Sequence, residues 1–209
     1  MAVYRLSTPI SEEIVRKLQV NDTLYLSGTI VTARDAAHRR ALRFHNEGRQ
    51  LPINLDGLAV FHCGPLMKQE NKGWMVIAAG PTTSSRMEPF EDEFIKYFNI
   101  RMIVGKGGMG KKTVDAMKKY GAVYGAFTGG AAVLAAKAIN RVKGVEWSDL
   151  GMPEAMWILE VEDFGPLTVA IDTHGNNLFE TIQTKVVKTK QQIYKKLGIN
   201  RLRFLGSQI

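Results

Sequence analysis

Gly80-Pro81-Thr82-Thr83-Ser84-Ser85-Arg86-Met87 and Gly105-Lys106-Gly107-Gly108-Met109-Gly110 are the two stretches around which this chain is organised. Each follows an apolar run that reads as a buried strand, Met75 to Ala79 before the first stretch and Met102 to Val104 before the second. In open α/β sheets, ligands bind outside the carboxyl ends of the strands. Glycine lets the backbone approach a ligand closely, and Arg86 and Lys106 supply positive charge. The two stretches therefore predict a pocket for a small anion, with a flexible loop as the alternative.

Gly105, Gly107 and Gly110 also match the spacing of a dinucleotide-binding loop. Such a site needs a carboxylate about 20 residues later, but residues 116–145 contain neither Asp nor Glu. The same run approaches a P-loop, except that Lys112 stands where the magnesium-binding hydroxyl belongs. The sequence disfavours both nucleotide motifs.

A second anion-friendly corner is expected around Arg34, after the extended segment that ends at Thr32. Asp35 is a plausible N-cap for a helix that reaches about Glu47, so Arg34 would lie beside free backbone N–H groups. His38 lies one helical turn later and could point at the same corner.

Apolar runs predict further strands over residues 58–63 and 122–127, and a pair of strands over 157–162 and 167–172 joined at Gly165-Pro166. Residues 68–73 read as a polar turn. Phe90, Phe94, Ile95 and Phe98 form a helical core stripe, and His62 and Cys63 read as buried core residues of a strand. No histidine pair has a trusted metal-ligand spacing, so no metal site is expected.

The length of 209 residues suggests one domain over 1–209, with a basic helix and tail at 179–209. The single cysteine excludes an internal disulfide and a metal site built from several cysteines of this chain, and it favours a reducing compartment. The N-terminus has no signal-peptide core, and the longest uncharged stretch, 121–136, is too short to span a membrane. A cytoplasmic protein without membrane contact is expected.

The net charge of +8 raises the possibility of nucleic-acid binding. The excess is concentrated after Glu180, where basic residues interleave with apolar residues at helical spacing: Leu178, Ile182, Val186, Ile193 and Leu197. That pattern is typical of an amphipathic helix with a solvated basic face. Since no aromatic platform accompanies it, we expect no nucleic-acid partner.

Several motifs together resemble one known family. They are Gly28-Thr29 with residues 33–38, the 80–87 stretch, Gly105-Lys106-Gly107, Gly129-Gly130 with residues 131–135, and Leu150-Gly151-Met152-Pro153-Glu154-Ala155. The chain is similar, from about Thr8 to Phe179, to the β subunit of class I iron–sulfur fumarase and of L-tartrate dehydratase. In single-chain class I fumarases the same sequence forms the C-terminal domain.

The resemblance implies an α/β fold: a single swivelling β/β/α-type domain with a mixed sheet and flanking helices. It also implies a reversible hydro-lyase acting on a C4 dicarboxylate, whose 4Fe–4S cluster is held by three cysteines. Because this chain has one cysteine, the cluster must be carried by an α subunit, in an expected α2β2 heterotetramer.

Roles follow from the resemblance residue by residue. Arg34 and Arg86 match the family's substrate-binding arginines, and a guanidinium grips a carboxylate through two parallel hydrogen bonds. Lys106 matches a lysine facing the charge of the aci-carboxylate-like state, and Thr82 matches a proposed proton-transfer threonine. Gly80, Thr83 and Gly105 complete the expected substrate site, with Asp35 and His38 in support.

A threonine hydroxyl is a poor base and needs a neighbour's help, from Asp35 or from a carboxylate of the α subunit. The Thr-Thr-Ser-Ser-Arg loop differs from the Thr-Thr-Ala-Gly-Arg typical of single-chain fumarases, and it also suits the tartrate enzyme. Fumarate hydration is the preferred reading, and L(+)-tartrate dehydration is the alternative. A stand-alone phosphate- or nucleotide-binding module is a third possibility.

Overall fold

A computed structural model of the chain describes residues 1–71 and 73–197. Residues Met1–Asn177 form one compact unit and Leu178–Ile209 a second. The main sheet of the first unit has seven strands in the order β1-β2-β3-β6-β7-β9-β8. Their bounds are Val3–Ser7 for β1, Thr23–Thr32 for β2, Ala59–Phe61 for β3, Met102–Gly105 for β6, Val123–Ala126 for β7, Ile139–Glu146 for β8 and Met156–Ile171 for β9.

The sheet is mixed and closes on itself. β2, β3, β6 and β7 run parallel to one another in that order. β9 runs antiparallel and pairs with β7 through residues such as Val169, and with β2 from Thr168 to Ile158. Because β9 pairs with both β2 and β7, these five strands form a ring whose interior is a packed core. Phe164 of β9 stacks edge-on against Phe61 of β3 there, with ring centroids 5.2 Å apart.

The expected pair of strands over 157–162 and 167–172 is wrong. One strand, β9, runs through Gly165-Pro166 without a hairpin. β2 likewise continues through Gly28, which has φ +98° and lies beside Thr8, and the register shifts locally there. Turn-forming residues predict a chain reversal, but pairing with β2 on one edge of β9 keeps the strand extended.

β4 (Leu66–Glu70) and β5 (Gly73–Ala78) pair in a separate two-stranded hairpin. Of the polar turn expected over 68–73, residues 68–70 belong to β4 and Gly73 to β5, and residue 72 lies outside the described residues. β5 was expected to be buried, but its residues alternate, and Met75 and Ile77 remain about two-fifths exposed at 40% and 41%. One face of the hairpin packs on the ring, where Trp74 meets Trp157 edge to face.

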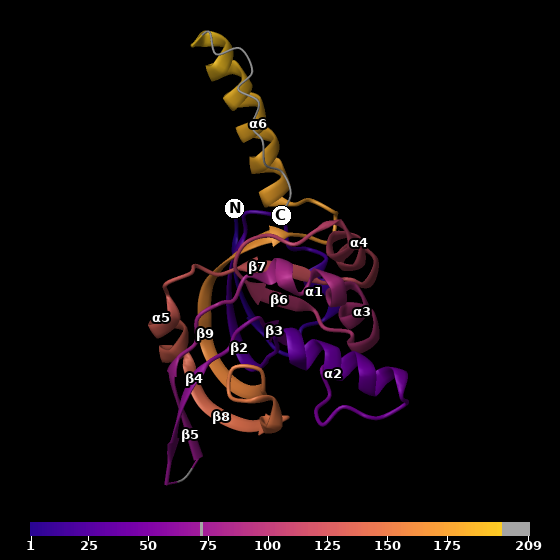
Figure 1. Cartoon of the computed structure of the whole chain (residues 1–209), viewed down its shortest axis with the longest axis vertical. Helices are drawn as coiled ribbons and strands as arrows, with labels where there is room; N and C mark the ends of the chain where they lie inside the picture. Colours follow the sequence, from indigo (N-terminus) through magenta and orange to yellow (C-terminus); the bar gives the residue numbers. More distant parts are fainter. Residues whose placement is uncertain (72, 198–209) are drawn as a thin grey trace. The chain divides into compact units, whose positions relative to one another are not determined.

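Helices flank the sheet as predicted, with α2, α3 and α4 grouped together in Figure 1. Their bounds are Glu12–Val15 for α1, Asp35–Asn46 for α2, Glu88–Phe98 for α3, Lys111–Tyr120 for α4 and Ala132–Lys137 for α5. α3 packs between α2 and α4. Of its predicted core stripe, Phe94 and Ile95 are fully buried, whereas Phe90 and Phe98 are half-buried. The expected mixed α/β architecture with flanking helices is confirmed.

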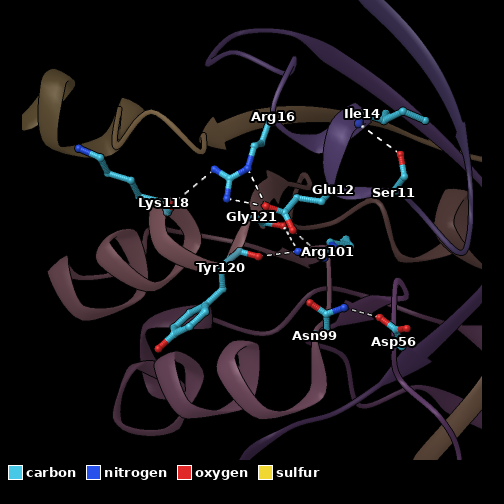
Figure 2. Close-up of polar contacts among 10 residues, drawn as sticks. All are labelled: Ser11, Glu12, Ile14, Arg16, Asp56, Asn99, Arg101, Lys118, Tyr120 and Gly121. Carbon is cyan, nitrogen blue, oxygen red and sulfur yellow. Dashed lines mark hydrogen bonds and ion pairs between the residues drawn. The ribbon is translucent and has the colours of Figure 1, made fainter.

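Arg101, just before β6, ties two of these helices together (Figure 2). Its guanidinium is buried and donates to the backbone carbonyls of Tyr120 and Gly121 at the C-terminal end of α4. It also pairs with Glu12 at the start of α1, at 3.1 Å. A cation at the C-terminal end of a helix satisfies carbonyls that the helix cannot use itself.

α6 (Leu178–Lys196) lies in the second unit, and it confirms the predicted amphipathic helix. Its lysines are exposed, as expected for a solvated basic face: Lys185, Lys188, Lys190, Lys195 and Lys196. The expected basic tail continues through Arg201 and Arg203, which lie outside the described residues. Over the described part of the chain, no helix has both the length and the apolar character needed to cross a bilayer.

Candidate active site

The carboxyl ends of the four parallel strands meet at one edge of the sheet. Arg34 follows β2, His62 follows β3, Lys106 follows β6, and the Gly129-Gly130 turn follows β7. The Lys106 side chain runs alongside this turn, since a Cβ on Gly129 would lie 3.5 Å from Lys106 Cδ. The strand expected before the 105–110 stretch is β6, and the Arg34 corner, expected from the sequence as a separate anion site, lies at the same edge of the sheet.

The 80–87 loop reaches the same edge by another route, because β5 belongs to the separate hairpin. The Thr82 N–H donates to the His62 carbonyl at 2.6 Å, and the Lys106 N–H donates to the Thr82 carbonyl at 3.3 Å. The Ser84 N–H then donates to the Lys106 carbonyl at 3.0 Å. These rungs insert the loop between the ends of β3 and β6, so Thr82 and Thr83 lie beside Lys106. Gly80, at the start of the loop, faces Ala132 of α5.

Arg34 is held in place at the start of α2. The residue is extended and occupies the N-cap position, so the expectation that Asp35 is the N-cap is wrong. Glu154, from the segment before β9, performs the capping, because one carboxylate oxygen accepts from the Ala36 N–H at 2.9 Å. The other lies 3.2 Å from Arg34 Nε. Gly64 leaves room for the guanidinium, since a Cβ there would lie 2.4 Å from Arg34 Nη1.

Arg86 forms an ion pair with Asp35, the first residue of α2. The Arg86 side chain is about half exposed at 48%, whereas that of Asp35 is 18% exposed. The pair joins the 80–87 loop to the helix that begins after Arg34. Asp35, which was considered as a helper for Thr82, directs its carboxylate to Arg86 instead.

Lys106 differs from the other cations of the site. Its side chain is exposed, and within residues 1–71 and 73–197 no carboxylate oxygen lies within 4.0 Å of its ammonium. Thr83 beside it is exposed as well, and Thr82 is half-buried. The site therefore offers an unpaired positive charge next to two hydroxyl-bearing residues on a solvent-facing surface.

The N-terminus of α4, which follows the glycine-rich run, is already occupied. Glu88 of α3 accepts from the Gly110 N–H at 2.6 Å and from the Thr113 hydroxyl at 2.8 Å. A carboxylate there fills the position in which a nucleotide-binding loop holds phosphate. The disfavoured dinucleotide and P-loop readings have no support in this geometry.

A buried polar cluster lies directly beneath the loops. His38, His62, Ser84 and Glu91 are fully buried. His38 Nδ1 lies 2.8 Å from the Arg34 carbonyl, so this histidine contacts the Arg34 corner as predicted. His62, expected to be a satisfied core residue, contacts Ser84 Oγ through Nδ1 at 2.9 Å. Both Nε2 atoms face Glu91 Oε2, at 3.4 Å from His38 and 3.0 Å from His62.

Sequence reasoning missed Glu91 and Ser84. A signal for Glu91 was present, because this acid falls on the same helical face as Phe94 and Ile95. The two imidazoles hold the pKa of the Glu91 carboxyl down, at about 2, against the effect of burial. Burial opposes the charged form of both rings, but the pKa of His38 is raised by Glu91 and the Arg34 carbonyl, whereas that of His62 is lowered by burial.

Cys63 is the only thiol of the chain and does not suit a cluster ligand. It is fully buried, and burial raises its pKa to about 12, so the thiol stays protonated at neutral pH. One protonated thiol cannot take the place of the three cysteines that a 4Fe–4S cluster needs. The residues of this chain do not fit that cofactor.

Comparison with known proteins bears on this site. Residues 2–182 match the family described as Fumarase C-terminus. The chain is 46% identical over 173 residues to the L(+)-tartrate dehydratase subunit beta of Escherichia coli K12, covering 83% of this chain and 85% of that protein. It is 44% identical over 191 residues to a Geobacillus stearothermophilus protein provisionally named a class I fumarate hydratase, covering 91% of this chain and 36% of that protein.

A Methanocaldococcus jannaschii protein, provisionally named an L(+)-tartrate dehydratase subunit beta, is 45% identical over 185 residues, which cover 88% of this chain and 95% of that protein. These relatives are named for hydro-lyases of two substrates. The match to the family extends over most of the compact first unit and includes every residue of the site. The chain therefore belongs to the fumarase C-terminus family of hydro-lyase subunits and domains.

Proposed function

We propose that this chain is the β subunit of a class I fumarate hydratase, which interconverts fumarate and L-malate. The observation that supports the proposal is the meeting of Arg34, Arg86 and Lys106 at one solvent-facing edge, with no carboxylate of the described residues beside Lys106. A dianionic substrate suits such a site, because each carboxylate can be gripped by a guanidinium. Thr83, Arg86 and Lys106 are exposed, which suits completion of the site by a second chain.

The partner in this proposal is an α subunit that holds the 4Fe–4S cluster, in an α2β2 assembly in the cytoplasm. The cluster supplies Lewis-acid chemistry at the hydroxyl that is added or removed. This chain supplies the other half of the reaction. Arg34 and Arg86 bind the two carboxylates, and their ion pairs with Glu154 and Asp35 hold both guanidinia in orientation before substrate arrives.

Thr82 transfers the proton at the carbon beside one carboxylate. Loss of that proton leaves the carboxylate in an aci form with a second negative charge, and Lys106 stabilises this form more than the substrate. Because the Asp35 carboxylate is engaged by Arg86, we assign the group that assists Thr82 to the α subunit.

Reconstitution tests the proposal. The isolated chain is expected to be folded, colourless and inactive on fumarate, L-malate and L(+)-tartrate, because it has one cysteine. Coexpression with a cysteine-rich partner from the same genome should give a brown complex with hydratase activity. Turnover of fumarate by the pure, iron-free chain would contradict the proposal.

L(+)-tartrate dehydration is the second candidate, and the 46% identity to the E. coli tartrate subunit favours it specifically. The site chemistry is shared, because tartrate is also a C4 dicarboxylate. Comparison of kcat/KM for fumarate, L-malate and L(+)-tartrate in the reconstituted complex distinguishes the two. A stand-alone phosphate-binding module would instead bind phosphate without a partner, and Glu88 at the start of α4 argues against it.

A further inference from the structure

The buried cluster beneath the site joins side chains from five different parts of the fold. His38 lies on α2, His62 follows β3, Ser84 follows the 80–83 loop, Glu91 lies on α3, and Tyr124 lies on β7. All five are inaccessible to solvent. Buried polar groups at this density are costly unless protons are placed to satisfy them, so the arrangement of protons can be worked out.

The contacts of His38 suit a doubly protonated ring, and, against the effect of burial, the pKa of this histidine is raised by Glu91 and the Arg34 carbonyl. The Arg34 carbonyl can only accept, so Nδ1 of His38, 2.8 Å away, donates to it. Nε2 faces Glu91, whose carboxyl is ionised at neutral pH and can also only accept. Both ring nitrogens of His38 therefore bear hydrogen, and the imidazolium balances the charge of Glu91 inside the core.

The contacts of His62 suit a neutral ring, and burial lowers the pKa of this histidine. The Tyr124 hydroxyl donates to Ser84 Oγ at 2.9 Å, which leaves the single hydroxyl proton of Ser84 free to point at His62 Nδ1, also 2.9 Å away. Nδ1 of His62 then accepts, and the hydrogen of the ring is on Nε2, which faces Glu91 at 3.0 Å. The cluster thus contains one positive and one negative charge.

Each end of this network reaches the site. His38 holds the backbone of Arg34, and the His62 carbonyl holds the N–H of Thr82 at 2.6 Å. Ser84 binds Lys106 through its backbone and His62 through its hydroxyl. Resting on the proposed function, we propose that His38, Glu91 and His62 form a positioning unit that fixes the Arg34 corner and the Thr82–Arg86 loop relative to each other, with Ser84 as its link to the proton-transfer threonine.

Gly105 shows how closely the sheet encloses the unit. A Cβ at this position would lie 1.9 Å from Ser84 Oγ, 3.1 Å from the Tyr124 hydroxyl and 3.3 Å from His62 Nδ1. The backbone of β6 thus forms one wall of the cluster. Gly105, which the sequence analysis assigns to the substrate site, also makes room for the positioning unit.

A metal ion is the competing explanation. The three facing ligand atoms of His38, His62 and Glu91 lie within 4.8 Å of one another, and among the described residues neither Nε2 atom nor either Glu91 oxygen has a well-aligned hydrogen bond. Two imidazoles and a carboxylate can hold zinc. We favour protons because zinc held by three protein ligands keeps an open position for water or substrate, and His38, His62 and Glu91 are all inaccessible to solvent.

The protonation pattern is tested on the ¹⁵N-histidine-labelled full chain, which does not depend on the proposed function. At pH 7 we expect two protonated nitrogens on His38 and a neutral His62 protonated at Nε2, with assignments from His38→Gln and His62→Gln. Zinc in stoichiometric amount by elemental analysis, or a neutral His38, would overturn the proposal.

The positioning role is tested by Ser84→Ala in the reconstituted enzyme, with exposed Ser85→Ala as the matched control. Loss of one hydrogen bond should lower kcat about tenfold while KM changes less than twofold, because Thr82 is misplaced but both arginines remain. Tyr124→Phe, which keeps the packing, should shift the His62 tautomer and lower kcat in the same direction. Unchanged kcat in Ser84→Ala would refute the role.

The two proposals fail differently. If the wild-type complex hydrates no dicarboxylate while the histidine signals are as expected, the proposed function is wrong and the proton arrangement stands. If the complex is active and Ser84→Ala matches Ser85→Ala in kcat, the function stands and the positioning unit is rejected.

Discussion

The two ends of β6 each have a cation, and the two cations differ in how many partners the protein gives them. Arg101 at the amino end is 7% exposed and donates to two carbonyls and a carboxylate (Figure 2). Lys106 at the carboxyl end is exposed, and no carboxylate in the described chain lies within reach of its ammonium. A cation whose donors are all used by the protein contributes to stability, whereas one left with free donors is available to a ligand.

The largest expected effect is at the carboxyl end. Lys106→Met should lower kcat by about 10²- to 10³-fold in the reconstituted enzyme, with a smaller change in KM, because its charge acts most strongly in the transition state. The free energy of unfolding should change by less than about 0.5 kcal/mol, since the side chain is exposed. Steady-state kinetics and urea titration measure both.

Gly107→Ala is the control for this change. Gly107 has φ +74° and open space around its missing Cβ, so alanine there should cost about 1 kcal/mol of stability through backbone strain. If Lys106→Met has a normal kcat while Gly107→Ala has a lowered free energy of unfolding, this end of β6 is only a tight turn. The contrast between Lys106 and Arg101 would then be wrong.

The opposite pattern is expected at the amino end. Arg101→Met should lower the free energy of unfolding by about 3 kcal/mol, because buried carbonyls at the end of α4 lose a charged donor. The kcat of the remaining folded enzyme should be unchanged. A variant with normal stability and impaired turnover would show that Arg101 serves the site after all.

Acid pH provides a further test of this comparison, because the loops at the carboxyl end of β6 lie over the buried Glu91 carboxylate. The pKa of Glu91 is lowered from 4.5 to about 2 in the folded state. Its contribution is therefore present in full above about pH 4.5 and is lost as the pH falls towards 2, on the order of 3 kcal/mol. Urea titrations from pH 5 to pH 2 should show a steeper loss in the wild type than in Glu91→Gln. Parallel curves would contradict the buried ion pair.

The smallest effects concern the two arginines. Arg34→Ala or Arg86→Ala should each lower kcat/KM by roughly 10- to 100-fold, since one charge-assisted contact to a carboxylate is lost. Arg40→Ala is the matched control. Arg40 lies on α2, the helix that follows Arg34, and its guanidinium forms a bidentate pair with Asp149 at 2.7 Å, outside the proposed substrate site. Equal kinetics for all three variants would remove Arg34 and Arg86 from the site.

Local pattern was enough to predict much of the fold and of the site. Apolar runs and glycines located β3, β6 and β7, apolar spacing located α3 and α6, and a helix-start residue located α2, because side-chain spacing and turn chemistry act within a few residues. The rule that ligands bind at strand ends placed Lys106 at a carboxyl edge of the sheet, whereas the sequence treated the Arg34 corner as a second site. The lone cysteine by itself excluded a 4Fe–4S cluster held by three cysteines of this chain.

Only the tertiary structure decided what depends on distant partners. β9 is one strand because β2 pairs along its edge, and β5 leaves the main sheet because β4 pairs with it. Glu154 holds Arg34 across 120 positions of sequence, and Glu91 meets two histidines from separate elements. No local spacing encodes such contacts, because the free energy of pairing or burying a group depends on neighbours that the folded chain brings near.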